Sequence, residues 1–337
     1  MTEATVSAGY AKALLDFAVM QGANEQRVLT RANIEPEALA DQDNRIAFAR
    51  FVALMRQAKA ETNNPALALE FGAASDLRKF SVVGLISHAS ANMREALTQL
   101  NRYGRLVVEV AGLLNGPRFQ LTHANGERWM EDRRPAPNDF VELTESTWSR
   151  FIVTSRRDFP GHTYALDAHV THDPPAYRTR YEEIWQVPVT FSSRWNAIRS
   201  DPSWELVQIQ PDNRYVFGVL TERGDALLKE LEGSRTVRGK VESLIIPILH
   251  TGEVTVETIA AKLNTSRQTL YRQLKDESAT FEQVLDELRH RMALDYIAAR
   301  RVSVNETAYL VGFSDPASFS RAFKRWTGKS PREYRGG

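Results

Sequence analysis

The C-terminal third of the sequence contains two pairs of cationic residues at the same spacing. Arg272 is followed by Lys275, and Arg321 is followed by Lys324. Residues three apart lie on one face of a helix, so each pair would present two positive charges in one direction. Such a pair suits double-stranded DNA, because a guanidinium can make two hydrogen bonds to the edge of guanine while an ammonium contacts phosphate.

The two pairs belong to a near-duplication. The segment TVETIAAKLNTSRQTLYRQLK starts at Thr255, and SVNETAYLVGFSDPASFSRAFK starts at Ser303. The copies align at an offset of 48 residues before a short turn and 49 residues after it. Each copy predicts a helix, a tight turn and a second helix, which is the spacing of a helix-turn-helix motif. We place the two motifs at about 255–275 and 303–325.

The residues between the helices fit this geometry. A left-handed residue is expected in each turn, where the copies offer Asn264 and Gly312. Ser266 is the expected N-cap of the first recognition helix. The second recognition helix has two candidate caps, Ser314 and Asp315, directly before a proline that suits a first helical turn.

Helical periodicity divides each recognition helix into two faces. Leu270 and Leu274 would face the core in the first helix, as would Phe319 and Phe323 in the second. The outward positions are Gln268, Arg272 and Lys275, flanked by Tyr271, and Ala317, Arg321 and Lys324, flanked by Ser320. An alternative is a helical bundle whose cationic faces meet only solvent.

An apolar stripe between the copies predicts a long connecting helix. It runs from Phe281 to Tyr296 at helical spacing. A helix of some 20 residues spans about 30 Å, close to the ~34 Å of one DNA turn. Such a helix could set the two recognition helices into successive major grooves.

Composition limits the class of protein. A chain of 337 residues favours two domains, and 42% hydrophobic with 25% charged residues is typical of globular chains. Cysteine is absent, which excludes disulfides and thiolate chemistry and fits a reducing cytoplasm. We find no apolar run long enough for a membrane helix and no secretion signal. Of 43 Lys and Arg residues, 16 lie from Thr236 onward, against 12 of 42 Asp and Glu residues, so the basic end is the one suited to a polyanion.

The residues before this region predict an α+β domain. Helical spacing dominates from about Tyr10 to Tyr103, and Asn115-Gly116 is typical of a hairpin turn. Later segments are expected as strands at 105–114, 118–124, 164–173 and 187–192, and as helices at about 138–156 and 220–231. The polar segment Glu232–Arg235 is the expected break. We therefore expect an effector-sensing or dimerisation domain at 1–233 and an all-α DNA-binding domain at 234–337.

These residues resemble a known family. The run SVNETAYLVGFSDPASFSRAFKRWTGKSPREYR closely resembles the C-terminal signature of the AraC/XylS family of bacterial transcription regulators. FEQVLDELRHRMALDYI resembles the linker helix of that family. The segments NPALALEFG, SVVGLISHASANMREALTQLNRYGRL and YEEIWQVPVTFSSRWNAI are similar to the arabinose-binding-like sensor domain of ornithine-utilisation-type regulators.

The resemblance implies a sequence-specific DNA-binding regulator, taken here as an activator, with two helix-turn-helix motifs joined by a long helix. It implies base contacts and neighbouring DNA contacts from Arg267, Gln268, Tyr271, Arg272, Lys275, Pro316, Ala317, Ser320, Arg321 and Lys324. Asn264-Thr265 stands where the family usually has Gly and an apolar residue, and Ser278 replaces a common Gly. These departures, with Gln268 in place of a frequent Arg, concern the target sequence rather than the fold. The implied partners are a small-molecule effector, RNA polymerase and a second copy of the chain.

The effector site is the least specified. Candidates in the N-terminal domain are His88, Arg102, Tyr103, Arg105, Trp129 and Trp148. Core packing is the alternative for each aromatic residue. Arg102 and Arg105 could pair with an effector carboxylate, and they could equally be solvated or paired with Glu109.

Other chemistry is set aside. His162, His169, His172 and Asp173 are close in sequence, but a strand directs His169 and His172 to opposite faces, so we predict no metal site. Gly328-Lys329-Ser330 lacks the upstream glycine of a P-loop. We predict no enzyme activity, no cofactor and no membrane partner. Two rival functions are a protein-binding adaptor and a sensor enzyme within the first 230 residues.

Overall fold

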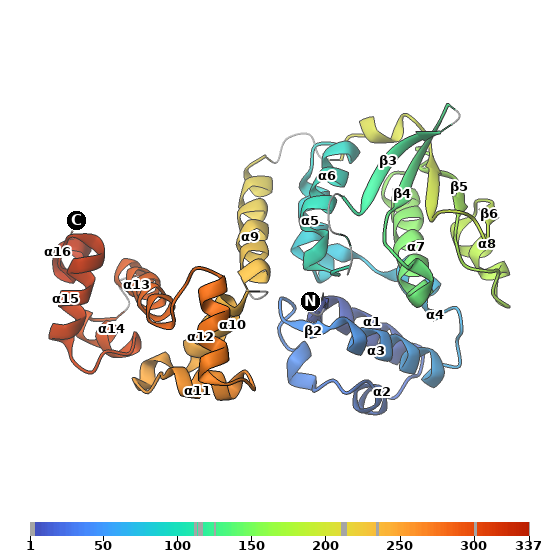
Figure 1. Cartoon of the computed structure of the whole chain (residues 1–337). Helices are drawn as coiled ribbons and strands as arrows, with labels where there is room; N and C mark the ends of the chain where they lie inside the picture. Colours follow the sequence, from blue (N-terminus) through green and yellow to red (C-terminus); the bar gives the residue numbers. More distant parts are fainter. Residues whose placement is uncertain are drawn as a thin grey trace. The chain divides into compact units, whose positions relative to one another are not determined.

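The chain forms two compact units. The computed structural model describes residues 4–110, 113, 117–124, 126–209, 214–233, 236–299 and 302–336. The units are Met1–Leu228 and Lys229–Gly337, and Figure 1 labels α-helices of both units and several strands of the first. The division falls within helix α9 (Arg214–Gly233), a few residues before the break that we expect from composition. Ser234 and Arg235 of that expected break lie outside the described residues.

The first unit begins with helices, as the sequence predicts. These elements are α1 (Ala8–Met20), α2 (Glu25–Ala32), η1 (Pro36–Leu39), α3 (Phe48–Glu61), α4 (Leu67–Ala74), η2 (Leu77–Lys79), α5 (Val82–Ala89) and α6 (Met93–Tyr103). Polar side chains cap several of them; Asn92, for example, accepts the Glu95 N–H at 3.0 Å. Two short strands, β1 (Thr5–Ser7) and β2 (Arg45–Ala47), pair antiparallel, and sequence periodicity misses them because each is only three residues long.

The strand predicted at 105–114 is wrong over its first residues. Helix α6 continues into a 3₁₀ turn, η3 (Gly104–Leu106), and Val108 then makes an isolated bridge with Val6. The segment is nevertheless held against β1, because the Glu109 N–H donates to the Thr5 carbonyl at 2.9 Å. The hairpin turn expected at Asn115-Gly116 lies outside the described residues.

A five-stranded sheet follows. Its strands are β3 (Phe119–Ala124), β4 (Glu127–Asp132), β5 (Ala165–His169), β6 (Val189–Thr190) and β7 (Ala197–Ser200). The order is β3-β4-β7-β5-β6, antiparallel except for the parallel pair β5–β6. The remaining elements are η4 (Pro137–Phe140), α7 (Val141–Asp158), α8 (Thr179–Trp185) and η5 (Trp204–Leu206).

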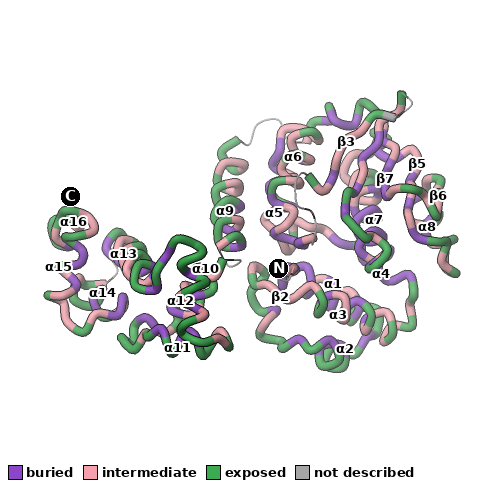
Figure 2. The backbone as a smooth tube through the Cα atoms, viewed as in Figure 1, coloured by how far each residue is buried: buried purple, intermediate pink, exposed green. Residues whose placement is uncertain are grey.

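Helix α7 is the central element of the first unit. Most of its residues from Leu143 to Ile152 are buried, which is typical of a helix enclosed on all sides. Trp148 and Ile152 share one apolar cluster with Phe119, Met130 and residues of α6 and α8. The buried course of α7 beside the sheet is visible in Figure 2. The five-stranded sheet and the helices packed around α7 together confirm the expected α+β class of the N-terminal domain.

The second unit is helical throughout its described residues, as expected. Its elements are α10 (Val237–Ile245), η6 (Ile246–Thr251), α11 (Val256–Lys262), α12 (Arg267–Asp276), α13 (Phe281–Ala299), α14 (Val304–Leu310), α15 (Pro316–Thr327) and α16 (Pro331–Gly336). One continuous core joins both sequence copies, from Leu270 and Leu274 through Val284 and Leu288 to Phe319. No helix among the described residues of either unit has the length and apolar character that crossing a membrane requires.

Candidate nucleic-acid interface

The first helix-turn-helix has the turn that the sequence predicts. Asn264 has a left-handed backbone, with φ of +50°. The Thr265 N–H donates to the Ala260 carbonyl at 3.0 Å, and the Asn264 N–H donates to the Ala261 carbonyl at 3.0 Å. This pair of bonds is a Schellman motif, which satisfies the free carbonyls at the end of α11. Ser266 then caps α12 by accepting the Thr269 N–H at 3.1 Å.

The second copy repeats that turn bond for bond. The Phe313 N–H donates to the Ala308 carbonyl and the Gly312 N–H to the Tyr309 carbonyl, both at 2.9 Å. Of the two candidate caps, Asp315 is the one used, accepting the Ser318 N–H at 2.8 Å, and the proline after it occupies the first turn of α15. The repeat read from sequence is therefore a repeat of backbone geometry.

The exposed face of α12 is the predicted one. Leu270 and Leu274 are fully buried, and the opposite face exposes Gln268, Arg272 and Lys275. Within the described part of the chain, the side chains of Arg272 and Lys275 have no polar partner. Both cations are consequently available to an anionic ligand.

Two flanking residues of α12 are engaged within the unit. The Arg267 guanidinium pairs with the Glu257 carboxylate of α11 at 2.9 Å and lies 5.8 Å from the centre of the Tyr271 ring. The half-buried Tyr271 donates its hydroxyl to Glu282 at 3.3 Å. These contacts hold the edge of the α12 face in a defined shape.

Helix α15 presents a matching face. Phe319 and Phe323 are fully buried, whereas Ala317, Arg321 and Lys324 are exposed. Pro316 and Ser320 are half-buried beside them. The Arg321 guanidinium donates to Ser318 of its own helix at 2.8 Å, an exposed contact that an acceptor on DNA could replace.

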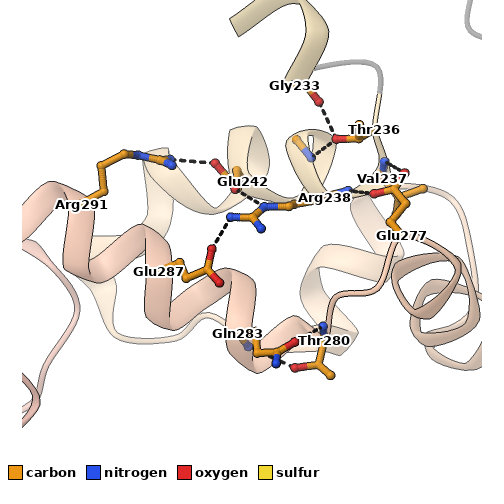
Figure 3. Close-up of polar contacts among 11 residues, drawn as sticks. Gly233, Thr236, Val237, Arg238, Glu242, Glu277, Thr280, Gln283, Glu287 and Arg291 are labelled. Carbon is orange, nitrogen blue, oxygen red and sulfur yellow. Dashed lines mark hydrogen bonds and ion pairs between the residues drawn. The ribbon is translucent and has the colours of Figure 1, made fainter. Parts of the chain in front are cut away.

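A polar network that sequence reasoning missed braces the first motif (Figure 3). The Glu277 carboxylate, just after α12, accepts the backbone N–H groups of Val237 and Arg238 at 2.7 and 2.9 Å. It thus lies at the positive end of α10, where a carboxylate is favoured. Arg238 also pairs with Glu242 at 2.9 Å and with Glu287 of α13 at 2.5 Å. Arg238 and Glu242 are four residues apart, a spacing that sequence can show, but the contacts to Glu277 and Glu287 join residues 39 to 49 positions apart and follow no local pattern.

Helix α13 contacts the second motif as well. The Arg289 guanidinium donates to the Gly312 carbonyl at 2.9 Å and lies 4.9 Å from the centre of the Phe313 ring. Burial lowers the pKa of Arg289. The Trp326 indole N–H of α15 donates to Asp286 of α13 at 2.8 Å. One helix of 19 residues, about 28 Å long, therefore supports both motifs.

The first unit contains a cavity of about 190 Å³, and His88 is the one predicted effector residue in its wall. Burial, together with the nearby charge of Arg78, lowers the pKa of His88, so its neutral form is favoured. Residues of α5, α6, α7 and the sheet line this cavity.

The other five effector candidates do not line this cavity. Arg102 pairs with Asp225 of α9 at 2.9 Å, and the Tyr103 hydroxyl donates to the same carboxylate at 2.7 Å. Burial and this carboxylate raise the pKa of Tyr103 to about 12. Arg105 lies 4.0 Å from Glu109, the alternative partner considered from sequence.

The two tryptophan candidates occupy the core. Trp129 packs against Trp195 and His169, with ring centres 5.1 and 4.8 Å apart. Trp148 is fully buried against Phe119. Trp129 and Trp148 are therefore packed in the core, which is the alternative considered for each aromatic candidate.

The histidines His169 and His172, set aside in the sequence, contact different partners. His172 contacts the Tyr181 hydroxyl at 3.1 Å, and His169 contacts Ser193 at 3.2 Å. In the described residues, no group of three or more His, Asp or Glu side chains is arranged to hold a metal ion.

Comparison with known proteins agrees with this geometry. Residues 22–205 match the family described as the arabinose-binding domain of AraC transcription regulators, and residues 259–337 match a helix-turn-helix domain family. The chain is 28% identical to the Ornithine utilization regulator of Pseudomonas aeruginosa over 99% of this chain and 97% of that protein. It is 26% identical to the transcriptional regulator VqsM of the same organism, over 79% of this chain and 82% of that one.

Among solved structures, the transcriptional regulator CdpR of Pseudomonas aeruginosa covers 93% of this chain and 96% of its own, at 21% identity and a TM-score of 0.44. The relatives carry the names of transcriptional regulators and not of enzymes. The arabinose-binding family match spans more than half of the chain, and the helix-turn-helix match contains α12 and α15. This chain therefore belongs to the AraC family of DNA-binding transcription regulators, in the branch with an arabinose-binding-type N-terminal domain.

Proposed function

We propose that this protein reads a specific DNA sequence with two recognition helices, α12 and α15, placed in successive major grooves. The bases would be contacted by Gln268, Tyr271 and Arg272 from α12 and by Pro316, Ala317, Ser320 and Arg321 from α15. Arg267, Lys275 and Lys324 would contact nearby phosphate or base edges. The observation that carries the proposal is the pair of identical turns, each followed by a helix that exposes an arginine and a lysine on one face.

Electrostatics supports different roles for the arginines and the lysines of the two helices. Arg272 and Arg321 can make paired hydrogen bonds to guanine in the major groove, which discriminate between bases. The lysines contribute charge that releases counterions and does not depend on sequence. The helix α13 between the motifs has a length comparable with one turn of DNA, so one side of the duplex could meet both helices.

The proposed regulatory roles follow from membership of the AraC family. We propose an activator in the bacterial cytoplasm, where chromosomal DNA lies, that binds as a homodimer and contacts RNA polymerase. A small-molecule effector in the first unit would change DNA affinity by binding two conformations of the protein unequally. The domain roles assigned at 1–233 and 234–337 are part of this proposal.

The test uses full-length protein and a random duplex library enriched by binding. An enriched duplex should bind more weakly to Arg272→Ala and Arg321→Ala by about 1–3 kcal/mol each, or roughly 5- to 160-fold. Lys275→Ala should weaken all duplexes similarly and reduce the salt slope by about 1. Arg133→Ala, an exposed arginine of the first unit, is the matched control and should bind like wild type.

Two outcomes would contradict the proposal. Failure to enrich any sequence would favour the adaptor function, in which the second unit contacts protein. Wild-type affinity in both arginine variants would show that the reading faces lie elsewhere.

A further inference from the structure

The cavity of the first unit is mostly apolar. Its walls include Leu97 and Leu100 of α6, Leu121 and Met130 of the sheet, Phe151 of α7 and Trp204. At about 190 Å³ it exceeds the engineered cavities of about 150 Å³ that bind benzene. A compact ligand somewhat larger than benzene is the size that it suits.

One buried cation in this wall lacks an acidic partner. Arg150 of α7 is 8% exposed and lines the cavity. Its Nε donates to the Ser75 hydroxyl and one Nη to the Tyr10 hydroxyl, both at 2.9 Å. Among the described residues, no carboxylate pairs with it. The guanidinium also lies 5.0 Å from the centre of the Tyr10 ring, so its buried charge has two hydroxyls and an aromatic face as partners but no carboxylate to neutralise it.

The acids around the cavity are already engaged by other cations. Asp76 pairs with Arg78 at 2.8 Å. Asp158 pairs with Arg157 at 2.7 Å. Glu205 pairs with arginines outside the cavity wall. Because each acid has its own cation, the unmatched positive charge in the wall belongs to Arg150.

A buried hydroxyl lies one helical turn away on the same face. Thr154 also lines the cavity, and its Oγ1 is buried with no hydrogen-bond partner among the described residues. A hydroxyl buried without a partner is unfavourable unless a ligand or water satisfies it. Residues four apart on a helix are neighbours, so Arg150 and Thr154 can both donate to a single bound carboxylate.

We propose that this cavity binds a small carboxylic acid with an apolar body. The carboxylate accepts hydrogen bonds from Arg150 and Thr154, and the body packs against the leucines, Phe151 and Trp204. The proposal rests on the effector control proposed above and gives its ligand class. A sugar suits the site poorly, because its several hydroxyls would lose water against an apolar wall.

The test measures binding by full-length protein in the absence of DNA. Hexanoate and phenylacetate are the probes, and hexanamide is the uncharged match for hexanoate. We expect saturable calorimetric binding of at least one acid, a change in tryptophan fluorescence because Trp204 lines the cavity, and at least tenfold weaker binding of hexanamide.

Variants test the named groups. Arg150→Gln should weaken acid binding at least tenfold, although its loss of contacts to Tyr10 and Ser75 can also affect folding. Thr154→Val removes a hydroxyl that has no internal partner, so the protein should stay folded while acid binding weakens several-fold. Arg133→Gln removes an exposed arginine outside the cavity and should bind the acids like wild type.

Three outcomes would overturn the proposal. The first is equal binding of hexanoate and hexanamide, and the second is no binding of either acid. The third is wild-type affinity in both Thr154→Val and folded Arg150→Gln. Amino acids form a separate arm, and a clear preference for them would assign the site to a zwitterion instead. Acid binding without DNA binding would refute only the DNA-reading proposal, and DNA binding without acid binding would refute only this one.

Discussion

The most informative substitution is Gly312→Ala, at the turn between α14 and α15. Gly312 has φ of +77°, and a methyl group there would lie 2.4 Å from the Leu249 carbonyl oxygen, whereas ordinary contacts begin at 3.4 Å. The left-handed backbone costs an L-residue about 1–2 kcal/mol. Overpacking against main chain adds about 1–3 kcal/mol. The second unit should therefore lose about 2–5 kcal/mol of unfolding free energy.

Gly252→Ala is the matched control. Gly252 has a similar φ of +73° in the same unit, but a methyl group there would meet nothing within 4 Å. It should cost only the backbone component, about 1–2 kcal/mol. The comparison separates close approach from backbone conformation, because both variants exchange glycine for alanine at positive φ.

Hydrogen exchange measured by mass spectrometry provides the assay. The slowest amides of α13 report unfolding of the second unit, since this helix contacts both motifs. Protection should fall roughly 30- to 5,000-fold in Gly312→Ala and roughly 5- to 30-fold in Gly252→Ala. An equal loss of protection in the two variants would show that the close approach of residue 312 to the Leu249 carbonyl costs no free energy, and the reasoning would be wrong.

Two further predictions concern one residue in each unit. Ser278 has φ of +58° at the end of α12, so Ser278→Gly should raise the unfolding free energy of the second unit by about 1 kcal/mol, while Ser278→Ala should not; the same exchange measurement checks it. Burial alone would raise the pKa of Asp132, but the Arg118 guanidinium, with a bidentate contact at 2.8 and 3.1 Å, holds that pKa below its usual value. The resulting stability is present above the unfolded pKa of about 4 and is lost as pH falls through the folded pKa. Thermal unfolding from pH 6 to 3 should show a steeper loss in wild type than in Asp132→Asn, and parallel losses would contradict this account.

Much of the DNA-binding unit could be predicted from local sequence. Turn residues, caps and a 3.6-residue periodicity act over less than one motif, so Asn264, Gly312 and the buried Leu270 and Phe319 followed from spacing alone. Because the motif occurs twice, the second copy gave independent support for the helix-turn-helix prediction. One detail remained open, since either of two polar residues could cap α15, and the structure selects Asp315.

The first unit was less predictable. The segment after α6 has the β-branched composition of a strand, yet it makes only an isolated bridge, because pairing depends on the distant β1 and not on composition. Most of the effector candidates were aromatic residues or arginines near the strands. Of these, Trp148 is enclosed in the core and Arg102 is held by Asp225.

The sequence by itself determined the two motifs, the faces of their recognition helices and the family, since each depends on residues within a few turns of one another. Only the tertiary structure decided which groups meet over long distances. Arg150 contacts Tyr10 across 140 positions, and Glu277 caps α10 across 40. A guanidinium is left without an acid, or a glycine is pressed against a carbonyl, only when packing brings separate elements together. Spacing along a chain does not encode that proximity.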